Sequence, residues 1–269
     1  MRKSLLSLAV LSTLAVPALS FADEVAPVVA PAAEAAPVNT VAYNVGLYSQ
    51  YIFRGLTQTA NKPAIQGGVD YTNASGFYLG TWASNVSWLG DAAAASADTF
   101  GYKNSSLELD LYGGYRGAIK DVAYDVGLLQ YVYPGTPNAS QKRAETTEVY
   151  GALTYKWVTA KVSVAVSDKV FGSANAAGTY YADLTANYPV TDTITATAHV
   201  GRQEYSGSGN DIYSYTDWKI GVSKTFANAV TVGAYYTDTN GQVAGYGPSV
   251  YAGGNIADAQ GTIYVQKTF

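Results

Sequence analysis

The ionisable side chains of this sequence stand in segments where polar and apolar residues alternate. In residues 105–116, leucines fall on one face of an extended chain, while Glu108 and Asp110 fall on the other. In residues 158–167, valines occupy one face and Lys161 belongs to the opposite, polar face. A period of two is typical of a β-strand. Acidic and basic side chains on the polar faces of several strands could form opposed charged rows, which select small solutes in pores.

His199 is the one histidine of the chain and the residue best suited to act as a general base near neutral pH. It shares a polar face with Thr195, Thr197 and Gln203. No serine elbow, phosphate loop or cluster of metal ligands accompanies it, and the chain has no cysteine. The sequence therefore predicts a protein that is not an enzyme, with no catalytic residue, metal or cofactor. A barrel hydrolase that uses His199, such as a lipase or protease, is the alternative.

The alternating pattern recurs along most of the chain, in segments of about the length that a tilted strand needs to cross a bilayer. Short connections and long Gly-, Ser- and Asn-rich connections follow one another in turn, as do the periplasmic turns and external loops of outer-membrane barrels. The predicted strands lie near residues 41–54, 63–71, 76–86, 105–116, 121–133, 146–156, 158–167, 179–188, 193–203, 214–226, 230–238 and 260–269.

These strands predict an all-β fold, a transmembrane antiparallel up-and-down β-barrel of about twelve strands, with ten or fourteen as alternatives. A soluble β-sandwich would also show alternation, but its dry core would not tolerate charges at mid-strand such as Glu108, Asp183 and Lys219. An even number of strands closes the barrel without a free edge. The barrel is expected to occupy residues 41–269.

Polar faces that point inward give a lumen in which acidic and basic side chains are nearly balanced. They could pair across the lumen and stabilise it, or form a selective constriction. Arg54, Glu108 and Asp110 are the leading candidates for such a constriction. The full set of predicted pore-lining residues is Arg54, Glu108, Asp110, Arg116, Glu148, Lys161, Asp183, Asp217 and Lys219, and Gln50, Gln66, Asp70, Lys156 and His199 belong to the same predicted lumen.

The N-terminal residues resemble export and linker sequences. Residues 1–22 combine Arg2 and Lys3 with an apolar stretch and a small-residue end at Ala22, which predicts a cleaved signal peptide, with an uncleaved anchor as the alternative. Residues 23–40 are rich in Ala, Pro and Val and predict a periplasmic spacer, or else a plug or cell-wall anchor. Cleavage removes two basic residues and changes the net charge from −4 to −6, which excludes an attraction to nucleic acid.

Several segments carry motifs of a known family, and Arg54 ends the most family-like strand. The segments include Tyr51-Ile52-Phe53-Arg54-Gly55-Leu56-Thr57-Gln58-Thr59, Gly76-Phe77-Tyr78-Leu79-Gly80-Thr81-Trp82-Ala83-Ser84-Asn85-Val86 and Glu108-Leu109-Asp110-Leu111-Tyr112-Gly113-Gly114-Tyr115. They resemble the TorF family of putative porins, a proteobacterial family of unknown function, over about residues 41–269. The resemblance implies an outer-membrane location and a pore-like role, and it supplies no site residues. The closing residues Lys267-Thr268-Phe269 belong to it, and a terminal aromatic residue is also similar to the signal read by the barrel-insertion machinery.

We therefore expect an outer-membrane porin of a Gram-negative bacterium that allows passive diffusion of small hydrophilic solutes. Its partners would be outer-membrane lipids, the barrel-insertion machinery during biogenesis, and the solutes themselves. The alternative is a structural or interaction barrel of the outer membrane that does not conduct, whose loops 87–104 and 239–259 bind a partner.

Overall fold

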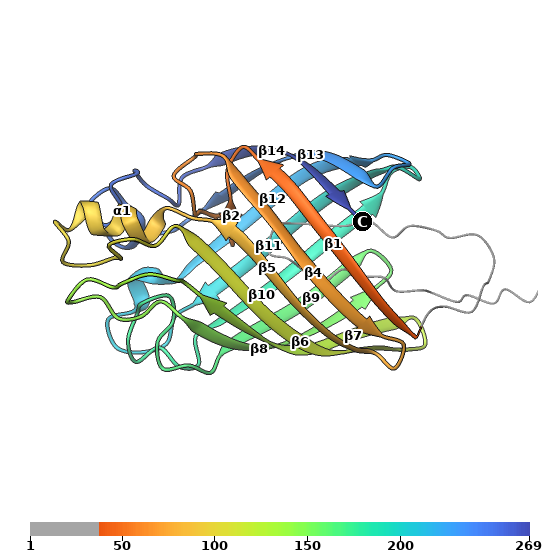
Figure 1. Cartoon of the computed structure of the whole chain (residues 1–269), viewed down its shortest axis with the longest axis horizontal. Helices are drawn as coiled ribbons and strands as arrows, with labels where there is room; N and C mark the ends of the chain where they lie inside the picture. Colours follow the sequence, from red (N-terminus) through yellow and green to blue (C-terminus); the bar gives the residue numbers. More distant parts are fainter. Residues whose placement is uncertain (1–37) are drawn as a thin grey trace, which may run out of the picture.

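The chain folds into a closed barrel of twelve antiparallel strands, seen in a computed structural model that describes residues 38–269 (Figure 1). The predicted signal peptide and nearly all of the predicted spacer lie outside the described residues. The strands are β1 (Asn39–Tyr48), β4 (Ala64–Asn73), β5 (Phe77–Asn85), β6 (Leu107–Ile119), β7 (Val122–Val132), β8 (Thr146–Tyr155), β9 (Val158–Ala165), β10 (Tyr180–Pro189), β11 (Ile194–Glu204), β12 (Tyr215–Thr225), β13 (Val230–Thr239) and β14 (Gln260–Thr268).

Each strand pairs with its neighbour in the chain order, and β1 pairs with β14 to close the barrel, from Asn44 opposite Thr268 to Tyr48 opposite Tyr264. The twelve-stranded fold predicted from the alternation is confirmed. The largest error concerns the first strand, which was expected to continue to residue 54 but ends at Tyr48. The residues after it turn into the barrel and form a small hairpin of β2 (Ile52–Phe53) and β3 (Leu56–Thr57).

Short turns and long loops lie at opposite ends of the barrel, with the C-terminus at the short-turn end (Figure 1). Lys120, Lys156 and Ala229 stand in short turns with φ values of 56°, 55° and 58°. Such left-handed residues give two-residue hairpins the twist of the flanking strands. By the usual arrangement of outer-membrane barrels, we assign the short turns to the periplasm and the long loops to the cell exterior.

The long loops contain helices that the alternation did not predict. Helix α1 (Trp88–Ala95) lies in the loop between β5 and β6, where Leu89 is fully buried. A 3-10 helix, η1 (Asp211–Tyr213), precedes β12, and the short helix α2 (Val243–Tyr246) lies between β13 and β14. No helix among residues 38–269 is long and apolar enough to cross a membrane.

The outer face of the barrel is apolar. Side chains such as Leu47, Leu79, Leu153 and Ile263 are more than half exposed and point away from the lumen. Exposed aromatic rings mark the short-turn end, at Phe77, Tyr155, Trp157, Tyr188, Phe226 and Phe269. Because a closed barrel leaves no unpaired strand edge, and because an apolar belt with aromatic rings at its border is matched to lipid, the fold places the protein in the outer membrane.

Candidate functional site

A hairpin folded into the barrel is the main feature of the lumen. We call residues 51–59 the inner hairpin, and each of them is buried. At its base, the amide of Gln58 donates to the carbonyl oxygen of Tyr51 at 2.8 Å, and the amide of Tyr51 donates to the Thr59 hydroxyl at 3.1 Å. At its tip, Arg54 and Gly55 have φ values of 48° and 80°, the left-handed pair that a tight two-residue turn requires.

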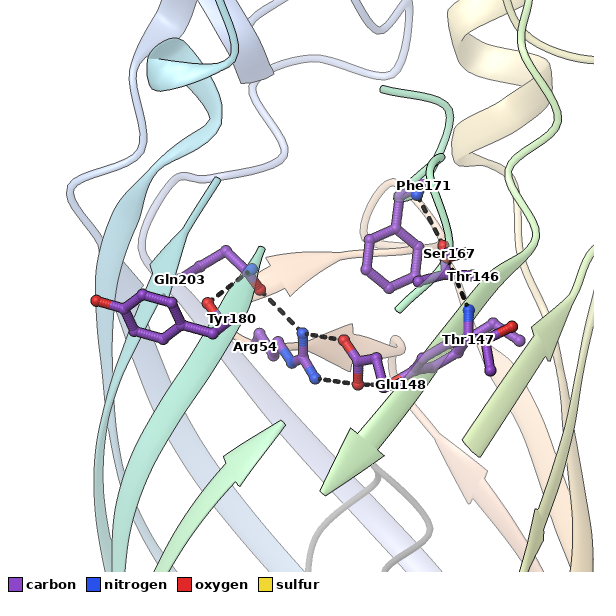
Figure 2. A network of polar contacts seen from close by, with 9 residues as sticks. Arg54, Thr146, Thr147, Glu148, Ser167, Phe171, Tyr180 and Gln203 are labelled. Atoms are coloured by element: carbon purple, nitrogen blue, oxygen red, sulfur yellow. Dashed lines mark hydrogen bonds and ion pairs between the residues drawn. The ribbon is translucent and has the colours of Figure 1, made fainter. Parts of the chain in front are cut away.

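The tip of the inner hairpin crosses the lumen and ends in a buried ion pair. Arg54 donates from Nη1 to Glu148 Oε1 at 3.0 Å and from Nη2 to Glu148 Oε2 at 2.8 Å, and Nη1 also donates to Gln203 Oε1 at 2.9 Å (Figure 2). Glu148 belongs to β8 and Gln203 to β11, across the barrel from β1 and β4, from which the hairpin starts. This two-pronged contact fixes both the position and the orientation of the guanidinium.

The ion pair is shielded by aromatic rings and by a second loop. The guanidinium carbon of Arg54 lies 4.4 Å from the ring centre of Tyr181 and 4.8 Å from that of Phe53. Phe171, in the loop between β9 and β10, packs against Phe53 with ring centres 5.6 Å apart. The side chains of Arg54 and Glu148 are each only 2% exposed. Water therefore hardly reaches this level of the lumen in the conformation described.

A carboxylate of β6 holds the base of the inner hairpin. The Tyr51 hydroxyl donates to Glu108 Oε1 at 2.7 Å, and Tyr133 also hydrogen-bonds Glu108. Asp110, two residues further along the same strand, is 2% exposed, and its Oδ1 atom has no hydrogen-bond partner in the described part of the chain. The two carboxylates predicted to form a constriction thus lie beside the hairpin that narrows the lumen.

The half of the lumen nearer the short turns is more open to water. Arg116 Nε lies 3.1 Å from Asp125 Oδ2, and their side chains are 12% and 17% exposed. The Arg116 guanidinium carbon lies 3.9 Å from the ring centre of Tyr78, whose hydroxyl bonds both Asp125 and Tyr150. The interior therefore has two parts, one filled by the inner hairpin and one lined by polar groups that water reaches.

His199 lies on the inner face of β11 within a network of hydroxyl and carboxylate groups. Its Nε2 atom is 3.2 Å from Asp217 Oδ1 and 2.9 Å from the Tyr181 hydroxyl, and its Nδ1 atom is 2.8 Å from the Thr185 hydroxyl. Every polar atom of the ring therefore has a partner in the wall of the barrel. Among the described residues, no group of three or more His, Cys, Asp or Glu side chains could hold a metal ion.

The structure brings the predicted pore-lining residues onto the inner face, with different partners. Lys161 lies over the ring of Tyr150 at 4.3 Å, and Lys219 over the ring of Tyr235 at 5.5 Å. Asp183 of β10 stands opposite Lys161 of β9 in the register. The others, described above, are Arg54, Glu108, Asp110, Arg116, Glu148 and Asp217, and all but Arg54 stand on strands.

One assignment to the lumen was wrong, and one residue of the lumen was placed on the wrong element. Lys156 was placed inside, but it lies exposed in the turn between β8 and β9, with φ 55° and its amino group 5.3 Å from the ring of Tyr155. Arg54 was placed at the end of a wall strand, but it stands at the tip of the inner hairpin. Sequence reasoning also missed Asp125 of β7, which pairs with Arg116 in the lumen and lies on a strand whose two faces are both largely apolar.

Structures titled as porins are among the known structures with a similar fold. A structure titled "KdgM porin" is 9% identical, with a TM-score of 0.51, over 86% of this chain and 99% of that one. A structure titled "KdgM porin in complex with disordered oligogalacturonate" is also 9% identical, with a TM-score of 0.50 over the same shares. A NanC porin structure is 9% identical, with a TM-score of 0.49 over 85% of this chain and 98% of that one. The first two likenesses, at this identity, show the fold alone.

No curated protein matches the sequence. Residues 32–269 match the family described as "Bacterial protein of unknown function (Gcw_chp)". Because this match covers most of the chain, including every strand of the barrel, the chain belongs to the Gcw_chp family of bacterial proteins.

Proposed function

We propose that the protein is an outer-membrane channel for the passive diffusion of small hydrophilic solutes, and that the inner hairpin controls its opening. The observation that carries the proposal is the inner face of a closed barrel, which is lined with ionisable side chains such as Arg116, Asp125 and Asp183 rather than packed as an apolar core. The resemblance to the TorF porins supports it. So does the shared fold with a porin described in complex with an oligogalacturonate.

The inner hairpin has the attachments of an element that can move at its tip. Its tip is held by side chains, chiefly the Arg54–Glu148 ion pair and the contacts of Phe53 with Tyr131 and Phe171. Its base is held by backbone hydrogen bonds to the long loops, from Thr57 to Ile256 at 3.0 Å and from Ser87 to Gln58 at 2.8 Å. A displaced tip would open the lumen without breaking the strand pairing of the barrel.

A second candidate function is a barrel that does not conduct and serves a structural or binding role. The burial of Arg54 and Glu148 favours it, because an ion pair that is 2% exposed on both sides seals the lumen at that level. Enzymatic hydrolysis has less support, because the structures with this fold reported above are porins. Outer-membrane lipids and the barrel-insertion machinery remain predicted partners.

Single-channel recording in a planar lipid bilayer tests the proposal. The full-length protein is compared with a variant in which three glycines replace residues 51–59. Three residues can bridge the gap because the two ends of the hairpin lie close together, with the Gln58 amide 2.8 Å from the Tyr51 carbonyl oxygen. We expect discrete openings of the full-length protein and a larger, steadier conductance of the variant. A silent full-length protein beside a conducting variant would favour a permanently sealed barrel. Silence of both, with circular dichroism typical of a β-barrel, would refute the channel.

A further inference from the structure

Acidic side chains outnumber basic ones inside the barrel of the structure. In the described part of the chain, the inner faces of the strands and the inner hairpin present seven acidic and four basic side chains, a formal net charge of −3 with His199 neutral. The acids are Asp70, Glu108, Asp110, Asp125, Glu148, Asp183 and Asp217, and the bases are Arg54, Arg116, Lys161 and Lys219.

Four of these acids stand outside the ion pairs of the described chain, and two of the four, Glu108 and Asp110, stand together on β6. The other two are Asp70, which accepts a hydrogen bond from Tyr112, and Asp183, which is opposite Lys161 in the register. Glu148 is neutralised by Arg54, Asp125 lies in contact with Arg116, and Asp217 lies beside His199. None of the ion pairs formed within residues 38–269 includes Glu108 or Asp110. The groups that bond Glu108 are the hydroxyls of Tyr51 and Tyr133, which donate hydrogen bonds but bring no charge.

The two uncompensated carboxylates occupy the narrow part of the lumen. They stand two residues apart on β6, so their side chains lie on the same face, roughly 7 Å apart along the strand. Tyr51 joins Glu108 directly to the inner hairpin. Once the tip of the hairpin withdraws and water enters, both carboxylates ionise. A solute that passes must then pass their negative charge, in a lumen with low-dielectric walls where charges act strongly on ions.

The external mouth offers acceptors as well. A cavity of about 580 Å³ lies there, between the loop after β1 and the loop before β14, and its lining includes Gln50, Asp258 and Gln260 but no Lys, Arg or His. The amide nitrogen of Gln50 donates to Gly261 at 3.0 Å, and that of Gln260 to Ile256 at 3.1 Å. The carbonyl oxygens of both glutamines are buried and accept no hydrogen bond within residues 38–269, whereas Asp258 is exposed. Such a lining suits solutes that carry hydrogen-bond donors or positive charge.

We infer that the channel prefers cations to anions, that Glu108 and Asp110 determine this preference, and that its natural solutes are small hydrophilic molecules bearing an ammonium or similar cationic group. The inference rests on the proposed channel function. An anion that entered the lumen would approach both carboxylates with no neighbouring base to offset them. A cation would replace the compensating charge that the wall does not supply.

The reversal potential in a tenfold KCl gradient tests this inference. We expect the wild-type channel to pass K⁺ more readily than Cl⁻. The double variant Glu108→Gln/Asp110→Asn changes the formal charge of the inner face from −3 to −1, and we expect it to lower the permeability ratio of K⁺ to Cl⁻ at least threefold. The control Asp121→Asn/Asp192→Asn removes two exposed acids from the short turns and should leave the ratio unchanged.

The outcomes separate the inference from the channel proposal. A conducting wild type that prefers Cl⁻, or a double variant that selects as the wild type does, overturns the inference while the channel stands. If the full-length protein is silent, the variant lacking residues 51–59 presents the same wall charges in an open lumen. A preference of that variant for K⁺ then supports the inference, and a preference for Cl⁻ overturns it. Should the double variant fail to insert, the ion preference of the wild type decides. Silence of both full-length and shortened proteins overturns both proposals.

Discussion

Replacing Arg54 with methionine should open the channel while leaving the barrel intact. The variant Arg54→Met keeps much of the side-chain volume but leaves the Glu148 carboxylate buried, with the Tyr131 hydroxyl at 3.2 Å as a remaining donor. Removing one partner of a buried ion pair typically costs about 3–5 kcal/mol. The protein can avoid this cost if the tip of the inner hairpin withdraws and water reaches Glu148.

A free-energy difference of about 1.4 kcal/mol changes an equilibrium constant tenfold. The cost therefore shifts the equilibrium between the docked and the withdrawn hairpin toward the withdrawn state, by about a hundredfold to a few thousandfold. The variant Glu148→Gln should shift it less, because Arg54 keeps its bond to Gln203 at 2.9 Å and its contact with the Tyr181 ring at 4.4 Å. The double variant Arg54→Met/Glu148→Gln leaves no uncompensated charge, so it should recover part of the closure lost in Arg54→Met.

The fraction of time that single channels spend open, measured for each variant in a planar bilayer, is the assay. The matched control is Arg202→Met, which breaks the Arg202–Glu204 pair, where the side chains are 44% and 40% exposed and the interaction is worth less than about 1 kcal/mol. An Arg54→Met channel that opens no more often than the Arg202→Met channel would show that the ion pair does not hold the lumen closed. The same result would contradict the role given to the inner hairpin.

Three further predictions test other parts of the structure. Gly55→Val should displace the tip and raise conductance, because the residue has φ 80° and an added Cβ atom would lie 2.7 Å from that of Asp217; a closed Gly55→Val channel would contradict this. Leu111→Arg places a charge on the lipid side near the middle of β6, where Leu111 is 48% exposed. It should lower the free energy of unfolding, measured by urea denaturation, by roughly 2–4 kcal/mol. An unchanged urea midpoint would mean that this face does not contact lipid. Tyr102→Phe removes the hydroxyl that accepts from the Ala144 amide at 2.9 Å, so proteolysis should cut the loop between β7 and β8 faster, without a change in conductance.

The strands of the barrel could be predicted because both faces of a membrane strand are under strong chemical constraint. Lipid requires apolar side chains outside, and a wet lumen tolerates charges inside, so β6 and β9 alternate clearly. In β6, Glu108 and Asp110 point inward and Leu111 outward, as the period of two predicts. The pairing of the strands then follows from their order in the chain.

The alternation is weaker where the inner face serves as a packing surface. In β7, Leu129 and Tyr131 point inward and are 2% and 0% exposed. Tyr131 packs against Phe53 of the inner hairpin, with ring centres 5.7 Å apart. Because both faces of this strand are apolar, its polarity pattern does not show that Asp125 faces the lumen.

The inner hairpin itself could not be predicted from local pattern. Tyr51, Ile52 and Phe53 are residues typical of strands, and they do form β structure, but as a hairpin inside the barrel rather than as a continuation of its wall. Local preference describes the conformation of a segment and not the side of the wall on which it lies. Gly55 was a turn signal within the most family-like segment, and it marks the tip.

The sign of the charge in the lumen depends on two residues whose positions local pattern does not reveal. Strict alternation along β8 places Lys156 inside, but the turn that begins there gives this residue a left-handed backbone, which frees its side chain to the exterior. Asp125, hidden in a strand with two apolar faces, enters the lumen instead. Because Lys156 leaves the lumen and Asp125 enters it, the nearly balanced interior expected from the sequence has a formal charge of −3. The inferred preference for cations follows from that difference. A measured reversal potential therefore tests the geometry of one turn and the orientation of one strand as directly as it tests transport.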